Sequence, residues 1–69
     1  MAKAKIHNHV RRLREERGIT QTDFARRCGC TRQTIIMLEQ ERYVPSLSLA
    51  FAVAKSLELT LEEVFEPEV

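Results

Sequence analysis

The sequence has few of the features that mark membrane-spanning, disordered or secreted chains. Its longest unbroken apolar run, from Leu49 to Ala54, is six residues long, whereas a bilayer-spanning helix needs about 20. A polar segment follows the basic residues near the start, which does not fit a secretory signal. Two glycines, two prolines and 43% hydrophobic residues leave few helix breakers and enough apolar side chains for a core. We therefore expect one small, cytoplasmic helical domain spanning residues 1–69.

Cysteine is also scarce, and its spacing does not fit the common structural uses. Cys28 and Cys30 are separated by one residue, which would strain a disulfide and does not match the paired ligands of structural zinc sites. His7 and His9 have the same unsuitable spacing. We expect buried apolar thiols and neither a metal nor a cofactor. A thiol or metal sensor that uses the two cysteines is an alternative.

Charge is unevenly distributed along the sequence. The formal net charge is +1, but residues 1–34 hold nine basic and three acidic residues, whereas residues 35–69 hold two basic and seven acidic ones. Such polarity is typical of a protein with a basic face for a polyanion and an acidic face turned away from it. A solvated surface of mixed charge would give the same counts.

Capping residues and apolar spacing predict five helices and hardly any strand. We expect the helices at residues 9–17, 21–28, 32–40, 47–57 and 61–65. The residues expected to cap their N-termini are Asn8, Thr20, Thr31, Ser46 and Thr60. Gly18 and Gly29 are expected to end the first two helices.

The expected helix at residues 47–57 has a wide apolar face. This face spans about 200°, twice the roughly 100° of an ordinary surface helix. It consists of Leu47, Ala50, Phe51, Val53, Ala54 and Leu57, with Leu49 at its edge. The helix therefore either lies at the centre of the core or also meets a second molecule.

A glutamate on an inward face predicts a buried ion pair. Glu39 lies on the same side of its helix as Ile35, and a partly buried carboxylate needs a cation. Arg14 flanks the buried side of the first helix and is the expected partner. We predict that Arg14 and Glu39 form a structural ion pair whose disruption is costly.

Residues 21–40 form two short helices joined by a tight turn. Ala25 leaves space for the second helix to cross closely, and Gly29 sits where the chain reverses, a position that often needs a positive φ. Ile35 and Leu38 supply the apolar underside of the second helix. This is the spacing of a helix-turn-helix, whose second helix can enter the DNA major groove.

Motifs along most of the chain resemble one known family. They are RxLRxxRGITQ from residue 11, FA at 24, TRQTI from 31, LE at 38, YxPSL from 43 and LxLTLEEVF from 57. In this order and spacing, over about residues 8–65, they resemble the phage-repressor-like (Cro/cI, or XRE) helix-turn-helix family, particularly its short stand-alone transcriptional regulators. The resemblance implies an all-α, five-helix, lambda-repressor-like DNA-binding domain whose helices 2 and 3 form the helix-turn-helix. It also implies the pair of Arg14 and Glu39.

The resemblance implies two sets of DNA-contacting residues. The expected base-contacting set is Arg32, Gln33, Thr34, Ile36 and Met37. The expected phosphate-contacting set is Gln21, Thr31, Arg42 and Tyr43, and Gln21 is also expected to brace the recognition helix. Independently, arginine suits guanine and glutamine suits adenine through paired hydrogen bonds. Ile36 and Met37 either meet thymine methyl groups or pack on the protein itself.

One residue departs from the family pattern in a place that matters. Family members usually have glycine at the position of Glu41, where the recognition helix ends in a left-handed conformation. Glutamate there costs about 1 kcal/mol if that backbone geometry is kept. It also places a negative charge near the expected DNA side.

The expected function is that of a sequence-specific transcriptional regulator, most simply a repressor, that binds double-stranded DNA. We expect a homodimer on a palindromic operator, joined through the fifth helix and the C-terminal tail (Val64, Phe65 and Val69), with residues around Ile6 as a further contribution. No membrane or small-molecule partner is expected. The alternative is a protein-interaction module of the same fold, antitoxin-like or a coactivator. An enzyme is not expected, because the sequence has no Gly-rich phosphate loop and no nucleophile–base arrangement.

Overall fold

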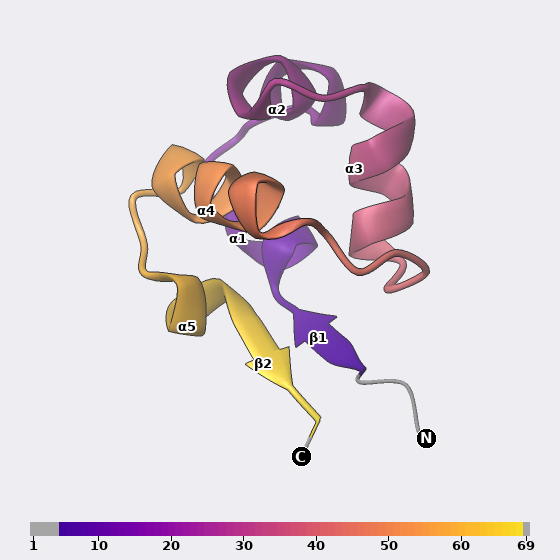
Figure 1. Ribbon diagram of the computed structural model, residues 1–69. Helices are drawn as coiled ribbons and strands as arrows, with labels where there is room; N and C mark the ends of the chain where they lie inside the picture. Colours follow the sequence, from indigo (N-terminus) through magenta and orange to yellow (C-terminus); the bar gives the residue numbers. More distant parts are fainter. Residues whose placement is uncertain (1–4, 69) are drawn as a thin grey trace.

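Five helices and one short β-ribbon make up the part of the chain that the computed structural model describes, residues 5–68 (Figure 1). The elements in chain order are β1 (Ile6–Asn8), α1 (Val10–Glu16), α2 (Gln21–Cys28), α3 (Arg32–Glu39), α4 (Leu47–Ser56), α5 (Leu61–Val64) and β2 (Phe65–Pro67). The predicted five-helix fold is confirmed. In the described residues no helix is both long and apolar enough to cross a bilayer.

The β-ribbon is the element that the sequence did not predict. β1 and β2 run antiparallel, with Ile6 opposite Pro67 and Asn8 opposite Phe65. A further bond from the backbone N–H of Glu68 to the carbonyl of Lys5 (2.8 Å) extends the pairing. The ribbon therefore ties the two ends of the described chain together beneath the helices (Figure 1).

Four of the five predicted N-caps act as expected. The side chains of Thr20, Thr31, Ser46 and Thr60 each accept a hydrogen bond from the backbone N–H three residues further on. α1 differs, because its first helical residue is Val10 and its N-cap position is His9, whose side chain makes no capping bond. Asn8, one position earlier, provides the capping acceptor instead, since its Oδ1 accepts a hydrogen bond from the N–H of Val10 (3.1 Å).

Two of the helices are followed by a glutamate in the left-handed conformation that glycine usually adopts. Gly18 and Gly29 have φ of 66° and 74°, and Glu41 and Glu58 have φ of 60° and 59°. After α3, the N–H of Glu41 bonds to the carbonyl of Leu38 and the N–H of Arg42 bonds to that of Met37, both at 3.0 Å. This pair of bonds is the Schellman motif. The left-handed backbone expected at Glu41 is therefore present.

The core lies between the helices and closes against the start of the ribbon. Its fully buried side chains are Val10, Phe24, Ile35, Leu38, Val53, Leu57 and Val64. The wide apolar face of α4 lies only partly in the core, because Ala50, Val53 and Ala54 are buried while Leu47 and Phe51 are 67% and 54% exposed.

The predicted subunit interface is wrong in two of its residues. Val64 is fully buried and Phe65 is 7% exposed, and both belong to the core of their own chain. They lie where α5 passes into β2, so the ribbon and the helices already cover them. Val69 lies outside the described residues.

Candidate nucleic-acid interface

α3 has one face in the core and one in solvent. Ile35 and Leu38 are fully buried, whereas Arg32 and Gln33 in the first turn are exposed. The close contact of α2 with α3 and the left-handed Gly29 between them hold α3 at the edge of the molecule (Figure 1). The first turn of α3 is therefore free to approach a partner.

The exposed arginine of α3 is not neutralised by the protein. Exposed arginines on α1 and α2 lie within 4 Å of carboxylates on the same helix: Arg11 with Glu15, Arg12 with Glu16, and Arg26 and Arg27 with Asp23. Among residues 5–68, Arg32 and Arg42 form no ion pair. Both charges are thus available to an anion.

The other residues predicted to contact bases are less exposed than Arg32 and Gln33. Thr34, Ile36 and Met37 are half-buried. The hydroxyl of Thr34 is also within 2.9 Å of the hydroxyl of Thr31, so the two share a hydrogen bond at the start of α3. Ile36 lines a groove of about 520 Å³ beside α1. The structure therefore gives Ile36 and Met37 partial contact with the protein and leaves part of each side chain accessible.

The ion pair between Arg14 and Glu39 is present and is bidentate. Nε of Arg14 donates to Oε2 of Glu39 at 2.7 Å, and Nη2 donates to Oε1 at 3.3 Å. The two side chains are 9% and 4% exposed. The remaining nitrogen, Nη1, donates to the carbonyl of Ile19 at 2.8 Å. One guanidinium thus connects α1, the turn before α2 and the end of α3.

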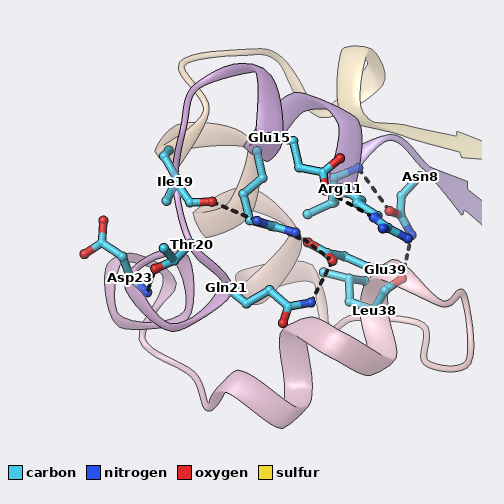
Figure 2. Close-up of polar contacts among 11 residues, drawn as sticks. Asn8, Arg11, Glu15, Ile19, Thr20, Gln21, Asp23, Leu38 and Glu39 are labelled. Atoms are coloured by element: carbon cyan, nitrogen blue, oxygen red, sulfur yellow. Dashed lines mark hydrogen bonds and ion pairs between the residues drawn. The ribbon is translucent and has the colours of Figure 1, made fainter.

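Gln21 braces α3 through the same carboxylate. Its Nε2 donates to Oε1 of Glu39 at 3.1 Å, and Figure 2 shows its amide directed at Glu39. Gln21 opens α2 and lines the groove beside Ile36, with Thr20 and Gln40. The expected bracing is therefore a feature of the structure, and the side chain stands at a helix N-terminus, where backbone N–H groups favour an anion.

The segment after α3 contributes two more exposed side chains. Arg42 is exposed, and Tyr43 is 36% exposed. Tyr43 also lines a hollow together with Thr34 and Ser46, which places it near the first turn of α3. The predicted phosphate-contacting residues thus lie at the start of α2 (Gln21), at the start of α3 (Thr31), near the first turn of α3 (Tyr43) and after the end of α3 (Arg42).

The sequence missed further side chains that hold the C-terminal end of α3. Asn8 donates from Nδ2 to the carbonyl of Leu38 (2.8 Å). Glu41 accepts from the backbone N–H of Asn8 (3.1 Å) and contacts His7 (3.2 Å). The one available signal was that Glu41 stands where glycine is usual.

The two cysteines are placed as apolar side chains. Cys28 is buried, with its Sγ 3.6 Å from the hydroxyl of Ser56, and Cys30 is half-buried against the core. Burial raises the pKa of both thiols, which lowers the population of the reactive thiolate. In residues 5–68 no three His, Cys, Asp or Glu side chains are grouped as metal ligands.

Comparisons with known proteins identify the class to which this arrangement belongs. The family model described as Helix-turn-helix matches residues 10–64. The chain is 41% identical, over 60 residues, to an uncharacterised HTH-type transcriptional regulator of Methanocaldococcus jannaschii, covering 87% of this chain and 91% of that one. It is 30% identical over 63 residues to the immunity repressor protein of Bacillus phage phi105, covering 91% of this chain and 44% of the phage protein.

A solved structure agrees with the fold. The chain matches the crystal structure of a protein from Bacteroides fragilis with a TM-score of 0.78 at 21% identity, covering 88% of this chain and 98% of that one. The protein described here belongs to the helix-turn-helix family, in its XRE or Cro/cI form. The family resemblance predicted from the motifs is confirmed.

Proposed function

We propose that this protein is a sequence-specific transcriptional regulator that reads duplex DNA in the major groove with α3, most simply as a repressor. One observation supports this above the others. Arg32 and Gln33 are exposed at the start of a helix whose underside is buried in the core and whose C-terminal end is fixed by hydrogen bonds from Asn8 and Gln21. A rigid helix with exposed, unpaired donors in its first turn is what reading base edges requires.

The chemistry of the exposed turn suits base recognition. The guanidinium of Arg32 can donate two hydrogen bonds to O6 and N7 of guanine, and the amide of Gln33 can pair with N6 and N7 of adenine. The proposed base-contacting set is Arg32, Gln33, Thr34, Ile36 and Met37. Ile36 and Met37 would offer apolar contact to thymine methyl groups from the accessible part of their side chains.

Contacts with the DNA backbone would position this turn. The proposed phosphate-contacting set is Gln21, Thr31, Arg42 and Tyr43. Gln21 and Thr31 stand at the N-termini of α2 and α3, where free N–H groups and the helix dipole attract phosphate. Tyr43 lies near the exposed turn, and Arg42 follows the C-terminal end of α3.

Salt dependence tests whether this face binds DNA as proposed. With about four phosphate contacts in each of two subunits, the logarithm of the association constant should fall against the logarithm of salt concentration with a slope near −7. The measurement is a titration of a duplex, selected from random sequences, at several salt concentrations. Binding that does not change with salt would contradict the proposed interface.

We further propose that the protein acts as a homodimer on a palindromic site. Two recognition helices about 34 Å apart would reach successive major grooves on one side of the duplex. The described surface with the largest exposed apolar side chains is formed by Val44, Leu47 and Phe51. An apolar groove of about 280 Å³, lined by Ile6 and Leu61 among others, continues it. This surface is our proposed two-fold contact. Phe65 lines its groove but is only 7% exposed, and Val64 is fully buried, so neither is central to the contact.

Substituting the most exposed of these residues should separate the subunits. Leu47→Glu places a charge in the proposed contact and should weaken dimerisation at least about tenfold, since tenfold corresponds to only about 1.4 kcal/mol. Sedimentation equilibrium of the free protein measures it. Thr22→Glu adds the same charge to an exposed position on α2 and should leave the dimer unchanged.

The same experiment separates the two candidate functions. A Leu47→Glu variant that dimerises as tightly as the wild type would contradict the proposed contact. A wild type that is monomeric and selects no duplex would favour the alternative, a protein-interaction module, because the apolar surface would then be free for another protein.

A further inference from the structure

His7 joins the β-ribbon to two carboxylates from distant parts of the chain. It is the central residue of β1. Its Nε2 lies 2.8 Å from Oε1 of Glu68, and its Nδ1 lies 3.2 Å from Oε1 of Glu41. A neutral imidazole has one N–H and cannot donate to both. Only the protonated ring, which has two N–H groups, can therefore donate to both carboxylates.

The contact with Glu41 reaches the recognition helix. Glu41 follows α3 and has a left-handed backbone, and its second carboxylate oxygen accepts from the backbone N–H of Asn8 at 3.1 Å. The side chain of Asn8 in turn donates to the carbonyl of Leu38, in the last turn of α3, at 2.8 Å. His7, Asn8, Glu41 and Glu68 thus form a clamp between the ribbon and the C-terminal end of α3.

Other charged groups surround the clamp on the same ribbon. His9 forms a separate pair with Glu66 at 3.3 Å, and Lys5 lies close enough to Glu41 to lower its pKa. The hydrogen bonds that its ring donates to the carboxylates of Glu68 and then Glu41 raise the pKa of His7 above its ordinary 6.5. The N–H of Asn8, and then His7, lower the pKa of Glu41 below its ordinary 4.5.

The two pKa shifts define the pH range in which the clamp is closed. A raised pKa for His7 means that its stabilising contribution is present below pH 6.5 and is lost as the pH rises through the value in the folded protein. A lowered pKa for Glu41 means that its contribution is present above pH 4.5 and is lost as the pH falls through its folded value. Between these limits both groups are charged and attract each other.

We propose that the clamp is a pH-responsive device, which fixes the segment after α3 for DNA binding while His7 is protonated and releases this segment when His7 loses the proton. The proposal rests on the proposed function, because its output is DNA affinity. Glu39, in the last turn of α3, stays held by Arg14 and Gln21, so release affects the segment after the helix, which carries Arg42, and not the fold. Rising pH is therefore expected to weaken DNA binding without unfolding the protein.

The test compares two matched histidine variants. His7→Gln removes the clamp's titrating group, whereas His9→Gln removes a neighbouring histidine that does not contact Glu41. The wild type and His9→Gln should bind a selected duplex about threefold to tenfold more tightly than His7→Gln near pH 6, the size of a modest coupling between sites. By about pH 8 this advantage should disappear. Equal pH dependence of affinity in the wild type and His7→Gln would overturn the proposal.

A measurement without DNA tests the clamp independently of the proposed function. Two-dimensional NMR of the wild type should show the backbone amide of Glu41 shifting with the titration of His7, at a pKa above the value of about 6.5 that is usual for histidine. A Glu41 amide that does not follow His7 would overturn the clamp. If no variant bound any duplex but the Glu41 amide followed His7, the clamp would stand and the proposed function would fail.

Discussion

Replacing Arg14 with alanine should cost about 3–5 kcal/mol of unfolding free energy, because it leaves a buried carboxylate without its cation. Glu39 is 4% exposed and receives two hydrogen bonds from Arg14 and one from Gln21. The carbonyl of Ile19 also loses a donor. In a domain of this size the melting temperature should fall by about 15 °C or more, as measured by circular dichroism or calorimetry.

An exposed arginine on the same helix provides the control. Arg12 forms an ion pair with Glu16 on the surface of α1, and such pairs contribute only about 0.3–0.5 kcal/mol. Arg12→Ala should therefore change the melting temperature little. An Arg14→Ala variant as stable as Arg12→Ala would show that the pair does not hold α1, α2 and α3 together.

Replacing Arg32 with alanine should have the largest effect on DNA binding among single exposed residues. Loss of a paired hydrogen bond to a base edge costs about 1–3 kcal/mol, or roughly fivefold to 150-fold in affinity. In a dimer the change occurs in both half-sites. Fluorescence anisotropy with a duplex selected by the wild type measures the loss. The variant should keep its stability, because Arg32 is exposed and forms no ion pair within residues 5–68.

A matched variant at Arg26 distinguishes recognition of a base from nonspecific electrostatic attraction. Arg26→Ala removes the same charge from an exposed position near the end of α2, so the two variants have equal net charge. If Arg32 recognises a base, Arg32→Ala should bind far more weakly than Arg26→Ala. Equal losses in the two variants would mean that Arg32 acts only through long-range attraction.

The helix-turn-helix could be predicted because its determinants are local. Thr20 and Thr31 begin α2 and α3, and Gly29 reverses the chain between them, all within twelve residues. Apolar spacing then fixes which side of α3 faces the core. The partner of Glu39 could also be predicted, because a carboxylate on a buried face needs a cation, Arg14 flanks the inward side of the first helix, and the family resemblance implies the same pair.

The ribbon could not be predicted, because its signal is not local. Its strands are three residues each, too short to show an alternating pattern, and they pair residues some sixty positions apart. The error over Val64 and Phe65 has the same origin. Apolar residues at the end of a chain suit a core or an interface equally, and the ribbon decides between the two by covering them.

The contacts of Glu41 show a further limit of local reasoning. Its left-handed backbone could be anticipated from its position after α3, and the cost of that conformation was clear. The contacts that offset this cost could not be anticipated, because the partners His7 and Asn8 lie more than thirty residues earlier in the sequence. Side-chain contacts that close over such distances depend on the complete fold.

The most direct test of the central claim, that the exposed turn of α3 reads DNA bases, is selection of duplexes from a random pool by two proteins in parallel. The wild type should enrich an inverted repeat whose half-site centres lie about 10 base pairs apart. The double variant Arg32→Ala/Gln33→Ala should lose the preference at matching positions in both halves and keep the spacing. Enrichment of the same full motif by both proteins would contradict the account.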